Sequence, residues 1–247
     1  MELEQTYRDT PIEGNVLQEV SASKNFMANV FIWMFAALSI SAISAFVFMS
    51  SPTLLMSLVN ETGLNLLGKI IMFAPLGFVL LMSFGFQRLS LPVLSAVFVL
   101  YSIINGISFS FILMIYTPGS VLSCFIAAAI MFGVMAVLGY TTDKDLTSFG
   151  RIMMMGLIGM VVVSLVNFFM QSEAVSYVIG IVGVLVFTGL TAYDVQKLKN
   201  ISRGFDANGN AMQITDTRKL AVMGALSLYL DFINLFLSLL RVFGRKN

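Results

Sequence analysis

The chain has 247 residues, of which 58% are hydrophobic and 11% are charged, and its formal net charge is +1. With a mean hydropathy of +0.91 it is too apolar for a soluble domain of this length, so we predict an integral membrane protein. The near-neutral charge indicates no nucleic-acid partner. The chain has no histidine and one cysteine, Cys124, which excludes histidine-based triads, histidine zinc sites and intramolecular disulfides.

The N-terminal segment, residues 1–25, is polar and net acidic. It lacks the basic start of a signal peptide. We therefore predict a mobile cytoplasmic tail in front of the membrane domain.

Seven apolar stretches of 18 to 24 residues occupy most of the remaining chain. At 1.5 Å per residue, each is long enough to cross a hydrocarbon core of roughly 30 Å. The stretches cover residues 26–49, 70–87, 93–116, 119–140, 149–170, 174–196 and 220–242. The prediction is an all-α membrane protein in which residues 26–247 form a single domain of seven transmembrane helices.

The positive charges predict the orientation of this domain. Ten of the 14 Lys and Arg residues lie on the same side of the membrane as the N-terminus, and four lie on the other side. Cytoplasmic loops carry the excess of positive charge in membrane proteins. We therefore expect the N-terminus in the cytoplasm and the C-terminus outside.

Two aspartates fall inside predicted spans, Asp194 near the end of 174–196 and Asp231 in the middle of 220–242. A carboxylate at the bilayer centre costs about 2.5–3.5 kcal/mol on insertion scales and is by default a sign of a functional site. These two residues are the candidate site.

Small and polar residues accompany Asp231 along one face of its helix. Gly224, Ser227, Asp231, Asn234 and Ser238 follow one another at intervals of three and four residues. Such a stripe must face protein or water. A simpler interpretation is a helix-packing seam, in which a neutral Asp231 is hydrogen-bonded to serine or asparagine.

The helix of Asp194 carries a matching face, because Gly180, Gly183 and Thr191 lie on the same side. Small residues let a neighbouring helix approach closely. Asp194 lies nearer its helix end than Asp231 does, however. A contact between the two carboxylates therefore requires a tilted helix or one that continues past Lys197.

Two carboxylates in contact cannot both ionise cheaply at low dielectric, so they are expected to share a proton and titrate in coupled steps. Loss of that proton leaves oxygens that repel each other unless a cation enters. Ca²⁺ prefers oxygen ligands. The pair is therefore predicted to act as a pH gate and as a possible calcium site.

Three segments resemble the Bax inhibitor-1 family, also called the transmembrane Bax inhibitor motif or YccA family. They are ALSLYLDFINLFLSLLRVFG at 225–244, AYDVQKLK at 192–199 and KDLTSF at 144–149. The first is the most specific, and the seven spans extend the likeness over nearly the whole chain.

This resemblance implies six helices packed around a central seventh. It also implies a pH-sensitive Ca²⁺ leak channel of the bacterial inner membrane whose acidic pair corresponds to Asp194 and Asp231. A basic residue at the cytoplasmic end of the second span is the family's partner for the first aspartate. In this chain that latch candidate is Arg88, which can also be a simple topology anchor.

Two other classes of function stay open. A non-transporting regulator would bind other membrane proteins, including quality-control proteases, through its tail or loops. An intramembrane aspartyl protease also carries two aspartates, and the Tyr193–Asp194 pair fits one of its motifs. The glycines that precede the second aspartate of such proteases are missing before Asp231.

The sequence thus predicts a non-enzymatic, passive, pH-gated cation channel with Ca²⁺ as the permeant ion. Its expected partners are membrane lipid, Ca²⁺ and protons. We expect no tightly bound cofactor.

Overall fold

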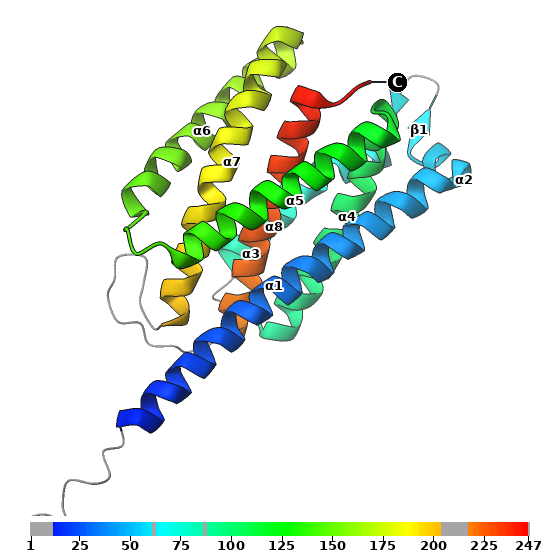
Figure 1. The fold of residues 1–247 in the computed structure, drawn as a ribbon. Helices are drawn as coiled ribbons and strands as arrows, with labels where there is room; N and C mark the ends of the chain where they lie inside the picture. The colour runs from blue at the N-terminus through cyan, green and yellow to red at the C-terminus, as the bar shows by residue number, and fades with distance from the viewer. Residues whose placement is uncertain (1–11, 61–62, 86–87, 204–216, 247) are drawn as a thin grey trace, which may run out of the picture.

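The fold was analysed in a computed structural model, which describes residues 12–60, 63–85, 88–203 and 217–246, with side chains from residue 25 onward. The described chain is almost entirely helical (Figure 1). Its long helices are α1 (Ile12–Ser50), α3 (Leu66–Gly85), α4 (Leu91–Ile115), α5 (Pro118–Thr141), α6 (Thr147–Met170), α7 (Glu173–Ser202) and α8 (Thr217–Phe243).

A short excursion joins α1 to α3. It contains the five-residue helix α2 (Pro52–Met56) and two antiparallel two-residue strands, β1 (Val59–Asn60) and β2 (Gly63–Leu64). Val59 pairs with Leu64 in this small ladder. The excursion lies at the same end of the molecule as the C-terminus (Figure 1).

In the described part of the chain, seven helices are long and apolar enough to cross a membrane. They coincide with the seven predicted spans, which confirms the all-α, seven-helix fold class. The last two residues of predicted span 70–87 lie outside the described residues. The N-terminal end of α1 and the C-terminus lie at opposite ends of the bundle (Figure 1), whereas the direction of the bundle in the membrane stays a prediction.

The predicted tail differs from the structure. Residues 12–24 are helical and continue α1 beyond its apolar span, which begins at Asn25. Extending an existing helix adds one hydrogen bond for each residue that is fixed, whereas a new helix needs a costly nucleus. A polar segment can therefore become helical without any apolar signal in its sequence. Residues 1–11 lie outside the described part.

Helix α8 is the most enclosed of the seven. Of its most apolar 18-residue window 67% is buried, compared with 0% for α6. Helices α1, α4, α5 and α7 pack against α8, whereas α3 packs mainly on α4 and α6 mainly on α7. The predicted arrangement of six helices around a central seventh is therefore not confirmed as a closed ring.

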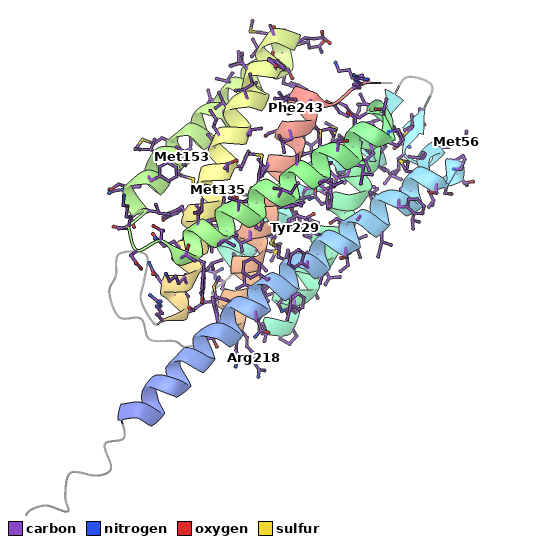
Figure 2. The ribbon with its side chains drawn as sticks, in the orientation of Figure 1. Met56, Met135, Met153, Arg218, Tyr229 and Phe243 are labelled. Carbon is purple, nitrogen blue, oxygen red and sulfur yellow. The ribbon has the colours of Figure 1, made fainter. Side chains whose placement is uncertain are left out.

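One polar cluster anchors α8 on the side of α1 and α4. The Tyr229 hydroxyl accepts a hydrogen bond from Asn105 Nδ2 at 2.8 Å and shares one of 2.7 Å with Ser41 Oγ. Ser41 Oγ also donates to the Ser102 carbonyl at 2.7 Å. All four residues are buried, and Figure 2 shows Tyr229 inside the bundle. Hydrogen bonds of this kind are what hold polar groups between helices in a membrane.

Helix α3 contains an internal proline, and α4 compensates for it. Pro75 has no N–H, so the carbonyl of Ile71 loses its ordinary helical partner. Ser108 of α4 donates its hydroxyl to that carbonyl at 2.7 Å. Membrane helices tolerate proline when a neighbouring side chain satisfies the freed backbone group in this way.

This contact predicts a conditional effect of the Ser108→Ala substitution. The free energy of unfolding should fall by about 0.6–1.7 kcal/mol, the range measured for hydrogen bonds between membrane helices. In a Pro75→Ala background the same substitution should cost clearly less, because an alanine at this position supplies the missing N–H. Thermal or denaturant unfolding in detergent micelles measures both values, and equal losses in the two backgrounds would contradict the assignment.

Candidate functional site

Helices α7 and α8 pack together as an antiparallel pair through small residues. At Gly183 there is no room for a Cβ atom, because it would meet Ser238 Oγ, and at Gly224 a Cβ would meet the side chain of Leu198. These two close approaches define how the helices are aligned. We refer to this contact of α7 with α8 as the α7–α8 seam.

The predicted stripe on α8 lies along this seam. Gly224 and Ser238 are buried, and Ser227 and Asn234 are half-buried. Asp231 is buried, with 6% of its surface exposed, whereas Asp194 is half-buried. The stripe therefore faces protein over most of its length.

The seam brings Asp194 level with Ser227, whose hydroxyl donates to Asp194 Oδ2 at 2.5 Å. Asp231 follows one turn later on α8, at a distance of about 6 Å along the helix axis. Side chains on a helix tilt toward its N-terminus. Because α7 and α8 run in opposite directions, the tilts of Asp194 and Asp231 converge. This geometry closes the one-turn offset.

The Asp194 and Asp231 carboxyl groups lie close enough to act on each other electrostatically. From the sequence, such a contact is expected to need either a tilted helix or one that continues past Lys197, and α7 continues to Ser202. Among the described residues, Asp231 Oδ2 is buried and has no hydrogen-bond partner. Within the described residues, the site therefore consists of two neighbouring carboxyl groups, one that accepts a hydrogen bond from Ser227 and one with an unsatisfied oxygen.

Arg88 is placed differently from the predicted latch. It is exposed in the connection between α3 and α4, and within the described ranges it forms no ion pair with Asp194. The cation whose charge acts on Asp194 is Lys197, three residues further along α7. A neighbour at this spacing lies on the same helical face. The role of Arg88 as a latch for Asp194 stays a prediction, because the described residues show no ion pair between the two.

One residue of the site region was missed by sequence reasoning. Gln196 is buried and bridges α7 to the connection between α5 and α6. Its Oε1 accepts from the Leu146 N–H, and its Nε2 donates to the Lys144 carbonyl, both at 2.8 Å. These bonds join the segments KDLTSF and AYDVQKLK in space. The pairing spans about 50 residues and leaves no local pattern in the sequence.

Asp145, in the same connection, illustrates an ordinary loop carboxylate. Its Oδ1 accepts from the Thr147 N–H at 2.8 Å, at the start of α6. Hydrogen bonds from Thr147 hold the pKa of this exposed carboxyl below its usual value. Asp145 is therefore ionised at neutral pH and serves as a control for the buried pair.

The residues described contain no group of three or more His, Cys, Asp or Glu side chains that could hold a metal ion. Asp194 and Asp231 together offer at most four carboxylate oxygens, whereas Ca²⁺ takes six to eight ligands. A cation at this position would need water or backbone oxygens as well. The pair is therefore better suited to passing Ca²⁺ through than to binding it tightly.

Sequence comparison finds one matching protein family and several related proteins. The family described as "Inhibitor of apoptosis-promoting Bax1" matches residues 23–247. The inner membrane protein YbhL of Escherichia coli is 42% identical over 96% of this chain and 98% of its own length. An uncharacterized protein of Rickettsia prowazekii is 39% identical over 90% of both chains, and one of Borreliella burgdorferi is 38% identical over 93% of this chain and 95% of its own.

A double-mutant cycle tests the contact between the two aspartates. Asp194→Asn and Asp231→Asn should be non-additive in the free energy of unfolding, with a coupling of about 0.5–3 kcal/mol, because the groups touch. The matched cycle combines Asp231→Asn with Asp145→Asn and should be additive within about 0.5 kcal/mol. Additivity in both cycles would show that the carboxyl groups do not meet.

Proposed function

The chain belongs to the Bax inhibitor family, and on that premise we propose that it is a passive, pH-sensitive cation channel with Ca²⁺ as its preferred ion. Its site is the Asp194–Asp231 pair, and its location is the bacterial inner membrane. The location is supported by the seven apolar helices and by the name of the related inner membrane protein of Escherichia coli. No resident cofactor enters this proposal, and neither does an enzymatic step.

The observation that carries the proposal is the contact of two carboxyl groups at a membrane-buried helix interface. Two negative charges at this spacing would be expensive, so one proton is expected to be shared between them. Asp231 is the more deeply buried and, within the described residues, has an oxygen without a partner, whereas Asp194 accepts from Ser227 and feels the charge of Lys197. We therefore assign the proton to Asp231 and the negative charge to Asp194.

Loss of this proton changes the forces across the α7–α8 seam. The hydrogen bond between the carboxyl groups is replaced by repulsion between two anions. The repulsion is relieved when the helices separate or when a cation enters between the oxygens. Both events favour the passage of a cation, and a hard divalent ion gains the most from two carboxylates.

The outer part of the seam supports a closed resting form. At Gly183 and Ser238 the helices are too close for even one additional carbon atom. We therefore place the closed constriction of the proposed cation pathway at these two residues. In the proposed cycle, repulsion at the pair opens this constriction.

A regulator that binds another membrane protein is the second candidate. The description of the matching family names inhibition of another protein. In addition, α1 extends beyond its apolar span by residues 12–24, roughly 20 Å, and projects from the bundle (Figure 1). Such a projecting helix is available to a partner, including a quality-control protease.

Calcium flux into proteoliposomes, measured from pH 5 to pH 8, tests the channel. The parent protein should pass more Ca²⁺ as the pH rises, because deprotonation of the pair opens the seam. Asp231→Asn and Asp194→Asn should each remove the pH dependence. Asp145→Asn is the matched control and should behave as the parent does.

The other outcomes separate the remaining candidates. Unchanged pH-dependent flux in both seam variants would show that Asp194 and Asp231 do not form the gate. Absence of flux in the correctly folded parent would favour the regulator. Cleavage of a labelled transmembrane substrate that both seam variants abolish would favour an aspartyl protease.

A further inference from the structure

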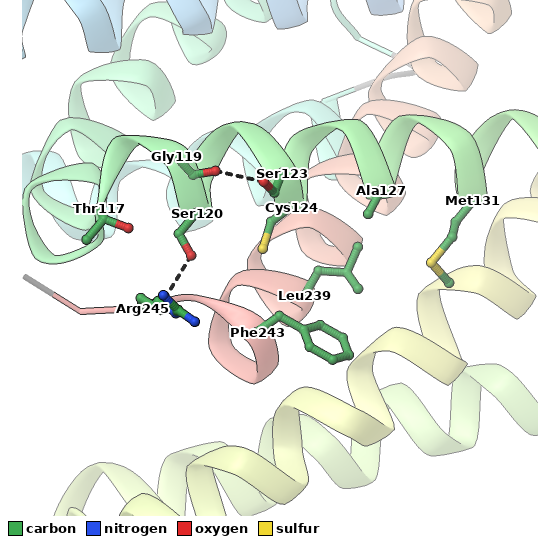
Figure 3. Close-up of a pocket in the computed structure, with 10 residues that line it drawn as sticks. All are labelled: Thr117, Gly119, Ser120, Ser123, Cys124, Ala127, Met131, Leu239, Phe243 and Arg245. Atoms are coloured by element: carbon green, nitrogen blue, oxygen red, sulfur yellow. Dashed lines mark hydrogen bonds between the residues drawn. The ribbon is translucent and has the colours of Figure 1, made fainter.

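A second site lies at the end of the bundle where α8 meets the start of α5. A cavity of about 690 Å³ opens there between the first half of α5 and the last turns of α8 (Figure 3). It is separate from the aspartate pair, which lies near the middle of α8. Neither the family nor the proposed channel assigns it a role.

The deep part of this cavity is apolar. Figure 3 shows Leu239 and Phe243 of α8 facing Cys124, Ala127 and Met131 of α5 across it. From Thr117, at the start of α5, to Met131 the cavity follows the helix for roughly 20 Å. One leaflet of the hydrocarbon core is roughly 15 Å thick. The cavity is therefore long enough to take an acyl chain from the bilayer surface to its centre.

The rim of the same cavity is polar and cationic. It is formed by Thr117, Ser120, Ser123 and Arg245. The backbone of Arg245 is held in place, because its N–H donates to Ser120 Oγ at 2.8 Å and its carbonyl accepts from the Thr117 N–H at 2.9 Å. These bonds fix the backbone of Arg245 beside the mouth of the cavity that this residue lines.

The charges around this rim favour an anion. Arg241 and Lys246 lie on either side of Arg245 in the sequence, and Lys246 is paired with Glu173 at 3.0 Å. Within the described ranges, Arg245 itself forms no ion pair. The first turn of α5 adds the positive end of a helix dipole beside it.

We propose that this cavity binds one anionic phospholipid, with an acyl chain along Cys124, Ala127 and Met131 and the headgroup phosphate at Arg245 and Ser120. A free phosphate would leave the apolar length unused, and a neutral lipid would leave the guanidinium without a partner. Arginine and hydroxyl groups are well suited to phosphate. The arrangement of an apolar interior below a cationic rim matches the two ends of this lipid.

Native mass spectrometry of the full chain in detergent tests the site, with phosphatidylglycerol and phosphatidylcholine of the same acyl chains as probes. The parent should retain phosphatidylglycerol in preference to phosphatidylcholine. Arg245→Gln should weaken phosphatidylglycerol binding about fivefold, the effect of roughly one basic residue at an anionic membrane surface. Arg245→Lys should keep most of the binding. Glycerol phosphate, which has the charge without the acyl chains, should not compete.

The apolar part is tested by Ala127→Phe, which fills the cavity and should abolish retention of the lipid. Ala127→Leu fills less and serves if the larger side chain prevents folding, which thermal unfolding reports. Two matched controls should behave as the parent does. Lys69→Gln removes an exposed charge from the same side of the bundle, and Ala42→Phe fills the apolar cavity on the other side of α5.

Three results would overturn the assignment. Equal retention of both lipids would mean that the rim does not distinguish an anionic headgroup from a neutral one. Undiminished retention in the cavity-filling variants would place the lipid elsewhere. Loss of a dimer in Ala127→Phe without loss of lipid would make this face an interface between copies of the chain.

Discussion

The burial of a carboxyl group in the most enclosed helix is the constraint on which the rest of this structure depends. Asp231 is buried, and the charge that acts on it is that of a second carboxyl group, Asp194. A buried acid is tolerated only with a partner or as a neutral group. The small residues of the seam make such a partner possible, because they let α7 approach closely enough for Asp194 to reach it.

The two faces of α8 differ in a way that suits a moving seam. On one face, Tyr229 is hydrogen-bonded to Ser41 and Asn105, so α1 and α4 hold the helix through neutral groups. On the other face, α8 packs against α7 through small residues and carries the Asp194–Asp231 pair. Tyr229 and Asp231 are two positions apart, with only one residue between them, which places them on nearly opposite sides of the helix. In the proposed channel, a change of charge at the pair would therefore act on the α7 side of α8, away from the Tyr229 cluster.

The sequence allowed the spans and the two membrane aspartates to be predicted, because both depend on local composition. A run of about 20 apolar residues identifies a helix, and Pro or charged residues mark its ends. The helical segment 12–24 could not be predicted in this way, since its helix is propagated from the span and carries no apolar pattern. The convergence of Asp194 and Asp231 was predictable only as a possibility, because it needs the observed alignment of α7 with α8. Contacts between distant segments, such as Gln196 with Lys144 and Ser108 with Ile71, leave no periodic signal at all.

The absence of histidine narrows the set of groups that can make this protein respond to pH. Histidine is the side chain whose unperturbed charge change falls between pH 5 and pH 8, and this chain has none. The hydroxyl and amide groups that anchor Tyr229 do not titrate in that range, and neither do the backbone bonds that fix Arg245. Asp145 is an ordinary exposed carboxyl that is already ionised there. Apart from the N-terminal amine, which titrates in this range in any chain, a response near neutral pH requires a group in an unusual environment, and within the described bundle the neighbouring carboxyl groups of the α7–α8 seam are the candidate.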